Sequence, residues 1–314
     1  MGVAGNVWFA VFLLRRLLAI VVLAWVVTLA AFGLFQVGVE SPAATTQINA
    51  QLGAGQPAPV QYLHYLLRLL HGNFGQSLTV GLPVSHVLWQ ALPPTLSLII
   101  GGMVLWLVAG TLIGIASAQQ HGSPADKNIT AAALTATVLP TFLTALLLLA
   151  LYGRISRSGN LWIQPGYVPF TRNPGQWLGR MILPWIATAA TQVGATARLT
   201  RAAVLDVLRE DYIQTAHAKG LPDEQVLWRH VLRPSITPVL TSISTGFGIL
   251  LGSAAIVDQV FALGGIGQQL LGSVRNGDLM LIMGTTLVTV ILISLVNLIT
   301  DIAQAIIDPR VRLN

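Results

Sequence analysis

The sequence predicts an all-α integral membrane protein. Of its 314 residues, 54% are hydrophobic and only 9% are charged, whereas a soluble domain carries about 25% charged residues. Six apolar stretches are long enough to cross a bilayer as helices. Charge gathers instead in one segment that must lie in water, because hydrocarbon does not accommodate it. The apolar stretches are 17–35, 95–118, 129–152, 181–204, 235–257 and 280–305, and the charged segment is 206–234.

The first apolar stretch follows Arg15-Arg16, a pattern shared by signal peptides and signal anchors. It is longer than a typical signal-peptide core and no small-residue cleavage site is evident, so we expect it to be retained as a span. Most of the 17 Lys and Arg residues fall on one side if the N-terminus is cytoplasmic. The sequence therefore predicts a multi-pass protein of the inner (cytoplasmic) membrane with both termini in the cytoplasm, in contact with membrane lipid and not with nucleic acid.

This topology places the segments 36–94 and 153–180 outside the cell membrane. Segment 153–180 carries arginines and no acidic residue. We expect Arg157 and Arg172 to dock an acidic surface of a partner protein there. Close helix packing is predicted where small residues recur four positions apart in the spans. Such pairs are Gly110 with Gly114, Ala190 with Gly194, and Gly248 with Gly252.

Several functions are disfavoured by what the sequence lacks. A proton-coupled carrier needs an ionisable residue within the membrane, but Asp258 and Asp301 fall near the ends of their stretches and not at the centre. A membrane scaffold would need large soluble domains. A phosphate-binding loop needs Gly-Lys before Ser or Thr, and Lys127 and Lys219 both follow other residues. We therefore expect a non-enzymatic chain without metal or cofactor, whose energy source lies on a partner.

The charged segment 206–234 predicts two short helices joined by a tight turn. Gly220 is placed to end the first helix in a left-handed conformation. Asp223 is a good N-cap for the second helix. An apolar side for the second helix comes from Val226, Leu227 and Val231. Such a helical hairpin forms a compact knob that can dock to another protein and transmit rigid-body motion to the neighbouring spans.

Several ordered motifs identify a family resemblance. Asp211-Tyr212-x3-Ala216-x-Ala218-Lys219-Gly220-Leu221, followed by Arg229-His230-x-Leu232, resembles the EAA loop of ABC importer permeases, and the match is closest to the B-type permease of the dipeptide/oligopeptide (and nickel) family. Further matches span nearly the whole chain. They are Gly72-Asn73-Phe74-Gly75-x-Ser77, Leu92-Pro93-x-Thr95-Leu96, Leu139-Pro140-x-Phe142, Arg198-Leu199-x-Arg201, Asp258-x-Val260-Phe261-x3-Gly265-x-Gly267 and Asp308-Pro309-Arg310.

The chain departs from the family pattern at a few positions. Gln214 stands in place of the Glu of the generic EAA motif, Asn73 in place of Asp, and Gly264 in place of Pro. Gly38-Val-Glu40-Ser-Pro42 occupies the position of a Pro-Gly-Asp-Pro segment. Gln214 lies within the hairpin at a position where this subfamily often varies, whereas the changes in the outer segments concern the outer docking surface and the substrate and not the coupling role.

The resemblance implies a six-helix type I ABC importer permease in which residues 1–314 form one transmembrane domain with a cytoplasmic coupling loop. It implies a second, related permease, two cytoplasmic ATPases that hold ATP and Mg, and an extracytoplasmic solute-binding protein. The implied cargo is a di- or oligopeptide, with nickel chelates, haem or another peptide-like solute as alternatives. The implied ATPase-coupling residues are Asp211, Tyr212, Thr215, Ala216, Ala218, Lys219, Gly220, Leu221, Arg229 and His230.

Overall fold

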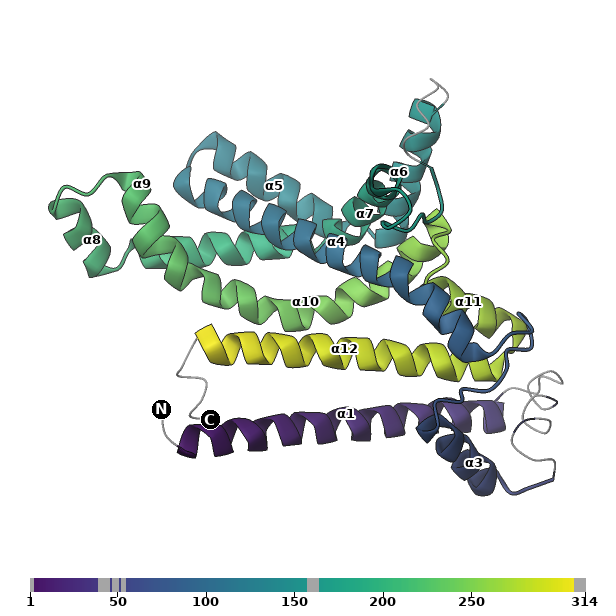
Figure 1. Ribbon diagram of the computed structural model, residues 1–314. Helices are drawn as coiled ribbons and strands as arrows, with labels where there is room; N and C mark the ends of the chain where they lie inside the picture. Colours follow the sequence, from purple (N-terminus) through teal and green to yellow (C-terminus); the bar gives the residue numbers. More distant parts are fainter. Residues whose placement is uncertain (1–2, 39–45, 47–50, 52–54, 157–163, 308–314) are drawn as a thin grey trace. The chain divides into compact units, whose positions relative to one another are not determined.

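The computed structural model describes residues 3–38, 46, 51, 55–156 and 164–307, which are helical apart from turns and an isolated bridge between Gln76 and Pro83. The chain divides into two compact units, unit 1 from residues 1–95 and 264–298 and unit 2 from residues 96–263 and 299–314. The named helices are shown in Figure 1. They are α1 (Val3–Gly38), α3 (Ala58–Leu70), α4 (Val84–Gln119), α5 (Pro124–Val138), α6 (Thr141–Ser156), α7 (Pro174–Leu208), α8 (Asp211–Ala218), α9 (Asp223–Val226), the π-helix η2 (Leu227–Val231), α10 (Leu232–Phe261), α11 (Ile266–Asn276) and α12 (Leu279–Ile307).

Length and apolar composition mark several of these helices as able to cross a bilayer. Within the described residues the segments Leu14–Gly33, Val84–Gln119 and Leu279–Ile302 qualify individually. Asp223–Leu240 and Thr245–Phe261 qualify together as one broken span bent by 59°. The chain is therefore a multi-pass membrane protein, and the boundaries and number of its six predicted spans stay a prediction.

The stretch predicted as 129–152 consists of two helices and not one. α5 ends at Val138, and Leu139 adopts an extended conformation with ψ of 124°. The cause is Pro140, because a proline disfavours the helical conformation of the residue before it. α6 then begins at Thr141, directly after that proline.

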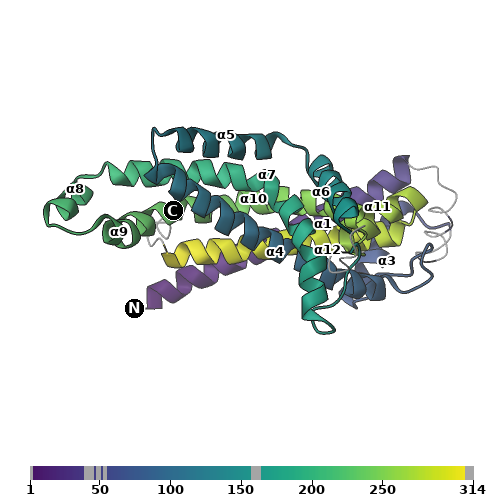
Figure 2. The same cartoon turned by 90° about the horizontal axis from the view of Figure 1, so that it is seen from above.

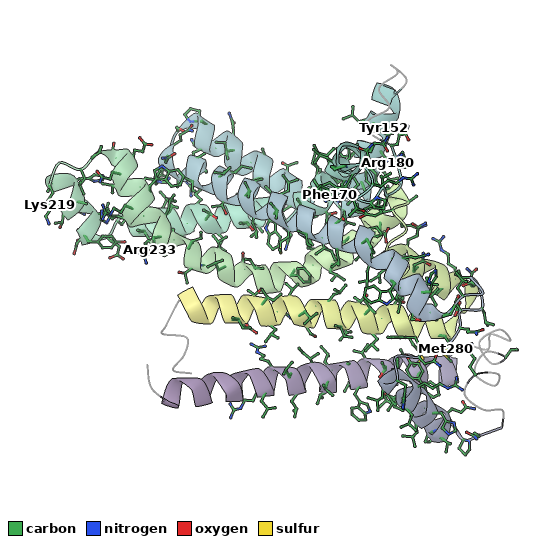
Figure 3. All side chains as sticks on the ribbon, in the orientation of Figure 1. Tyr152, Phe170, Arg180, Lys219, Arg233 and Met280 are labelled. Atoms are coloured by element: carbon green, nitrogen blue, oxygen red, sulfur yellow. The ribbon has the colours of Figure 1, made fainter. Side chains whose placement is uncertain are left out.

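Unit 1 forms around α1, α3 and the N-terminal turns of α4 and α12. Its core contains Phe32, Tyr62, Val84, Leu279 and Met280, all buried. Met280 is labelled at the start of α12 in Figure 3. Aliphatic and aromatic side chains from distant parts of the sequence thus hold α3 and the start of α12 in one cluster.

A buried carboxylate joins the loop before α4 to the start of α12. Asp278 is completely buried, and its Oδ2 accepts hydrogen bonds from Ser77 Oγ at 2.5 Å, Thr79 Oγ1 at 2.8 Å and the Thr79 backbone N–H at 3.1 Å. Its Oδ1 accepts from the backbone N–H of Leu281 at 3.2 Å and caps the helix. This explains the position of Ser77 in the motif 72–77.

We expect Asp278→Ala to lower the thermal stability of the purified protein markedly. The change removes a helix N-cap, typically worth about 0.5–2 kcal/mol, and takes an acceptor away from the buried Ser77 hydroxyl, at about 1–3 kcal/mol. Asp278→Asn keeps an acceptor and should lose less. The measurement is the unfolding temperature in detergent, and equal temperatures for Asp278→Ala and the unmodified chain would contradict this role.

Small residues allow α4, α5 and α7 of unit 2 to approach closely. A Cβ added at Gly114 would lie 2.6 Å from the carbonyl oxygen of Ala197, and one at Gly110 would lie 2.8 Å from the side chain of Thr196. One added at Gly194 would overlap the carbonyl oxygen of Ala133 in α5. The close packing predicted for these two spacings is confirmed. At Gly248 and Gly252, by contrast, an added Cβ meets nothing within 4 Å.

These contacts predict opposite outcomes for two alanine substitutions. Gly194→Ala forces α5 and α7 apart, and overpacking of this kind costs about 1–3 kcal/mol. Gly248→Ala is the matched control, because its methyl group enters open space in this chain. We expect a clearly lower unfolding temperature and folded yield for Gly194→Ala only. A lower temperature for both variants, or for neither, would contradict the packing.

The α10 span bends between Leu240 and Thr245 in unit 2. Pro238, which cannot donate a backbone hydrogen bond, lies within the helix shortly before this break. Beyond the bend, the carbonyl of Gly246 accepts a hydrogen bond at 3.2 Å from the buried side chain of Gln192. A Cβ at Gly246 would overlap the ring of Trp106, so glycine is required there. The polar Gln192 thus has a structural role between α7 and α10.

Candidate functional site

The charged hairpin, residues 206–234, protrudes at one end of unit 2. Both Figure 1 and Figure 2 show α8 and α9 beyond the ends of α5, α7 and α10. Figure 3 places Lys219 at its tip and Arg233 where the chain returns into α10. A segment of this kind presents side chains from two helices on a narrow projection.

The first arm of the charged hairpin, helix α8, ends in a glycine-dependent turn. The Gly220 backbone N–H donates to His217 O at 2.9 Å, and the Leu221 N–H donates to Ala216 O at 3.3 Å. This pair of bonds is a Schellman motif, which needs a left-handed backbone conformation at the residue after the helix C-cap, here Gly220. Gly220 has φ of +79°. The left-handed helix end predicted at Gly220 is confirmed.

The second arm, which consists of α9 and η2, begins differently from the prediction. Pro222, not Asp223, occupies the N-cap position, and no side chain caps the helix. The carboxylate of Asp223 lies 3.4 Å from His217 Nε2 across the turn instead. Proline is tolerated at a helix start because it has no backbone N–H that would need a partner there. Asp223 therefore lies in the first helical turn, where its negative charge still favours the helix dipole.

A π-helix connects the second arm to the membrane helix. η2 (Leu227–Val231) carries Arg229 and His230, and the Leu232 N–H donates to Leu227 O, five residues back. π-helices are rare and often occur at functional sites. The chain runs from η2 directly into α10, so motion of the charged hairpin reaches α10 without an intervening loop.

An apolar core holds the two arms together and onto the helices behind them. Ile213 and Ala216 from the first arm pack with Val226 and Val231 from the second. The apolar side predicted for Val226, Leu227 and Val231 is confirmed, since all three belong to or contact this cluster. The same cluster includes Ala118 of α4 and other residues of α4 and α7. The charged hairpin is therefore a packed extension of unit 2 and not a solvated connector.

The predicted coupling residues divide by exposure. Ala216 is buried in the core of the charged hairpin, and Leu221 and His230 are half-buried, so these three support its shape. The others are exposed and available to a partner. They are Asp211, Tyr212, Thr215, Ala218, Lys219, Gly220 and Arg229.

Sequence reasoning missed one exposed residue of the charged hairpin. The Trp228 side chain is 63% exposed on η2, and the sequence assigned it neither to the apolar side of the second helix nor to the coupling residues. Tyr212 is also exposed, at 45%. Partial burial and the nearby carboxylate of Glu210 raise the pKa of Tyr212, so the phenol stays neutral. Exposed aromatic side chains of this kind are typical of the anchors of protein–protein interfaces.

An ion pair between the buried Asp126 and the half-buried Arg201 lies between α5 and α7, behind the charged hairpin. Arg201 of α7 donates to both carboxylate oxygens of Asp126, at 2.9 and 2.7 Å. Ser117 Oγ donates to the same carboxylate at 2.5 Å, and the Gly122 N–H donates at 3.1 Å. The hydrogen bonds from Arg201 and Ser117 hold the pKa of Asp126 well below its usual range. Neither the pairing nor its burial was predicted, because the two residues are far apart in the sequence.

The outer arginines are only partly described. Arg157 lies outside the described residues, whereas Arg172 is exposed in a short turn before α7. The backbone N–H groups of Arg172 and Asn173 both donate to Pro169 O. The Asn173 side chain then caps α7. The Arg180 guanidinium, by contrast, is engaged within the chain, where it donates to Pro165 O and to Gln164 Oε1.

Comparisons with known proteins agree with this architecture. Residues 110–313 match the family "binding-protein-dependent transport system inner membrane component". The chain is 35% identical over 272 residues to a putative peptide transport system permease protein of Brucella abortus, covering 87% of this chain and 86% of that one. It is 31% identical to a probable peptide ABC transporter permease protein of Sinorhizobium fredii, covering 96% and 99% of the two chains.

A solved structure shares the fold. The inward-facing methionine ABC transporter MetNI aligns with a TM-score of 0.57 at 17% identity, covering 71% of this chain and 96% of that one. The predicted all-α fold of an importer permease is thus confirmed, and so is the family resemblance of the motifs. This chain belongs to the family of binding-protein-dependent transport system inner membrane components, the permeases of ABC importers.

Proposed function

We propose that this chain imports di- or oligopeptides together with a second, related permease, and that the charged hairpin couples it to cytoplasmic ATPase subunits. The observation that carries the proposal is the packing of the charged hairpin onto the helices behind it. Its two arms share a buried core with α4 and α7, and it is continuous with α7 on one side and α10 on the other. Movement of a docked ATPase would therefore displace both helices together.

The docking surface consists of the exposed residues of both arms. Asp211 and Lys219 provide opposite charges on α8 and its C-terminal end, and Arg229 provides a positive charge on η2. Trp228 and Tyr212 add aromatic area, which supplies most of the binding energy in typical interfaces. A cleft of the ATPase would take up the tip of the charged hairpin, and the buried Ala216 would keep the two arms together.

Transmission into the membrane follows from contacts within unit 2. Ser235, at the start of α10, donates to Ala203 O of α7 at 3.3 Å and to Val231 O at 2.7 Å. α7 and α10 also pack against each other along their lengths. Rigid-body motion of the charged hairpin would therefore move α7 and α10 as a pair, and alternating access would arise between the two permeases.

The remaining components follow from the same role. ATP and Mg would bind on two cytoplasmic ATPase subunits, and this chain would carry neither catalytic residue nor cofactor. An extracytoplasmic solute-binding protein would deliver the cargo. The chain would lie in the inner (cytoplasmic) membrane with both termini in the cytoplasm, as the distribution of Lys and Arg favours.

A peptide cargo is supported by the names of the relatives in Brucella and Sinorhizobium. A further relative, from Salmonella choleraesuis, is a glutathione transport system permease protein, 34% identical over 278 residues. Glutathione is itself a tripeptide, so the three names agree on the chemical class. Nickel chelates, haem and other peptide-like solutes are the alternatives.

The proposal is tested by uptake into vesicles that contain the complete importer. The chain is co-expressed with its candidate second permease, ATPases and binding protein, and labelled di- and tripeptides are offered. We expect uptake that requires ATP and the binding protein and persists when ion gradients are dissipated. Uptake driven by an ion gradient without ATP would reject the mechanism. ATP-driven uptake of a nickel chelate or haem but of no peptide would reject only the cargo.

The outer docking site leads to a prediction about salt. We propose that the exposed Arg172, with Arg157 nearby in sequence, contacts an acidic surface of the binding protein. Exposed charge pairs are individually weak and are screened by salt. Arg172→Glu should therefore reduce binding-protein affinity and uptake at low ionic strength and have little effect at high ionic strength. Arg275→Glu, at another exposed arginine, is the charge-matched control. Identical salt profiles for the two variants would reject the site.

A further inference from the structure

Helix α3 in unit 1 has two apolar faces. One face packs into the core through Tyr62 and Tyr65, which are nearly completely buried. The other face is exposed, and its residues recur every three or four positions, so they form one stripe along the helix. This stripe consists of Val60 (38% exposed), Leu63 (55%), Leu67 (46%) and Leu70 (82%). Four large aliphatic side chains on one short helix form an apolar surface that water does not favour.

Contacts with α1 set the depth of α3 relative to the membrane. The Tyr62 hydroxyl lies 3.0 Å from Thr28 Oγ1 and donates to Trp25 O at 3.2 Å. Both partners belong to the apolar span Leu14–Gly33. Because a helix rises about 1.5 Å per residue, they lie about 8 and 12 Å below the end of that span at Gly33. The ring of Tyr62 also contacts Phe32, with centroids 5.4 Å apart. Thus the buried face of α3 contacts α1 inside its apolar segment.

We propose that α3 is an interfacial membrane helix, with the stripe of Val60, Leu63, Leu67 and Leu70 inserted among lipid acyl chains in the leaflet where α1 ends. Figure 1 shows α3 beside the C-terminal end of α1, and Figure 3 shows side chains projecting from α3 on the side away from α1. Amphipathic helices of this kind insert about 5–10 Å into the boundary between headgroups and acyl chains. This agrees with the depth given by Tyr62. The proposal is independent of the cargo and of ATPase coupling.

Charge on the polar side of α3 fits a phospholipid surface. Arg68 is exposed in the last turn, one residue from Leu67, and His71 follows the helix end. Long basic side chains at the edge of an apolar face extend toward phosphate groups while their stems stay in the apolar layer. There is no acidic residue in α3 to oppose this attraction.

Backbone groups at both ends of α3 make hydrogen bonds within the chain, which favours a lipid environment. Pro57 and Pro59 have no backbone N–H, and the N–H groups of Val60 and Gln61 both donate to Pro57 O. At the other end, the N–H groups of Gly72 and Asn73 donate to Leu69 O and Arg68 O. Backbone groups in hydrocarbon must be satisfied within the protein. These terminal bonds therefore reduce the cost of inserting the helix.

The test uses the complete importer in phospholipid vesicles, with single cysteines introduced into the naturally cysteine-free chain. Leu63→Cys, Leu67→Cys and Arg68→Cys are labelled with a small fluorophore. Each is quenched either by aqueous iodide or by phospholipid brominated on its acyl chains. We expect the labels at positions 63 and 67 to be quenched several-fold more by brominated lipid than by iodide. The label at position 68 should show a smaller ratio, shifted toward iodide.

Two results would overturn the proposal. Quenching of all three labels mainly by iodide would place the stripe in water. Protection of positions 63 and 67 from both quenchers would show that a protein surface covers the stripe, with the second permease as the first candidate. The unfolding temperature of each labelled variant is also measured, in order to check that the packing of α3 against the core is intact. Leu63 and Leu67 are outside that core, so no large change is expected.

Discussion

Gly220→Val is expected to abolish most ATP-driven uptake while leaving the chain folded in the membrane. At φ of +79° a residue with a Cβ costs about 1–2 kcal/mol, and a β-branched residue is a stronger outlier there. A cost of that size shifts a local equilibrium about 5- to 30-fold. The Schellman bonds of Gly220 and Leu221 would open, and the second arm would lose its direction.

The control for this prediction isolates backbone conformation from side-chain contact. A Cβ at Gly220 meets no atom within 4 Å, so steric overlap inside the chain is not the cause of the loss. Gly220→Asn also adds a side chain, but Asn tolerates the left-handed region. We expect Gly220→Asn to retain most ATPase association and uptake. Co-purification of the ATPases and peptide-stimulated hydrolysis are the measurements. Full coupling in Gly220→Val would mean that the charged hairpin only connects two helices.

Local chemistry explains which parts of the charged hairpin could be predicted from sequence. Gly220 was predictable because a left-handed helix end favours glycine and because the surrounding pattern is local. The apolar side of Val226, Leu227 and Val231 was predictable from its spacing. The N-cap was not, because Asp223 and Pro222 both suit a helix start and only the path of the chain decides between them. The exposure of Trp228 depends on the π-helix, which has no simple sequence signature.

Long-range features were not accessible from the sequence. Asp126 and Arg201 look like ordinary loop and helix-end charges until α5 and α7 are packed together. Asp278 likewise meets Ser77 only through the fold of unit 1. The small-residue spacings show the same limit, since Gly110, Gly114 and Gly194 make close helix contacts whereas Gly248 and Gly252 have none in this chain. A motif shows that close packing is possible, and the tertiary structure decides where it occurs.

Arg201→Met is expected to be among the most damaging single substitutions in the protein. Methionine keeps most of the length of the side chain but removes both donors to the buried Asp126 carboxylate. Removing the half-buried guanidinium leaves the buried Asp126 carboxylate without its main counter-charge, and an uncompensated buried charge is costly. α5 and α7 would separate behind the charged hairpin. We expect a lower unfolding temperature, a lower folded yield and a loss of ATP-driven uptake.

A second substitution distinguishes electrostatic from packing effects. Adding Asp126→Asn to Arg201→Met removes the uncompensated charge while keeping acceptors for Ser117 and Gly122. The double variant should therefore recover much of the folded yield and uptake that the single variant loses.

The pH dependence of the stabilisation by Asp126 has a defined sign. A lowered pKa means that the stabilisation by Asp126 is complete above its ordinary value of about 4 and is lost only as the pH falls through the lowered value. Asp126 itself therefore contributes the same stabilisation at pH 6 and at pH 8. A double variant no better than Arg201→Met would show that Arg201 acts through packing and not through its charge.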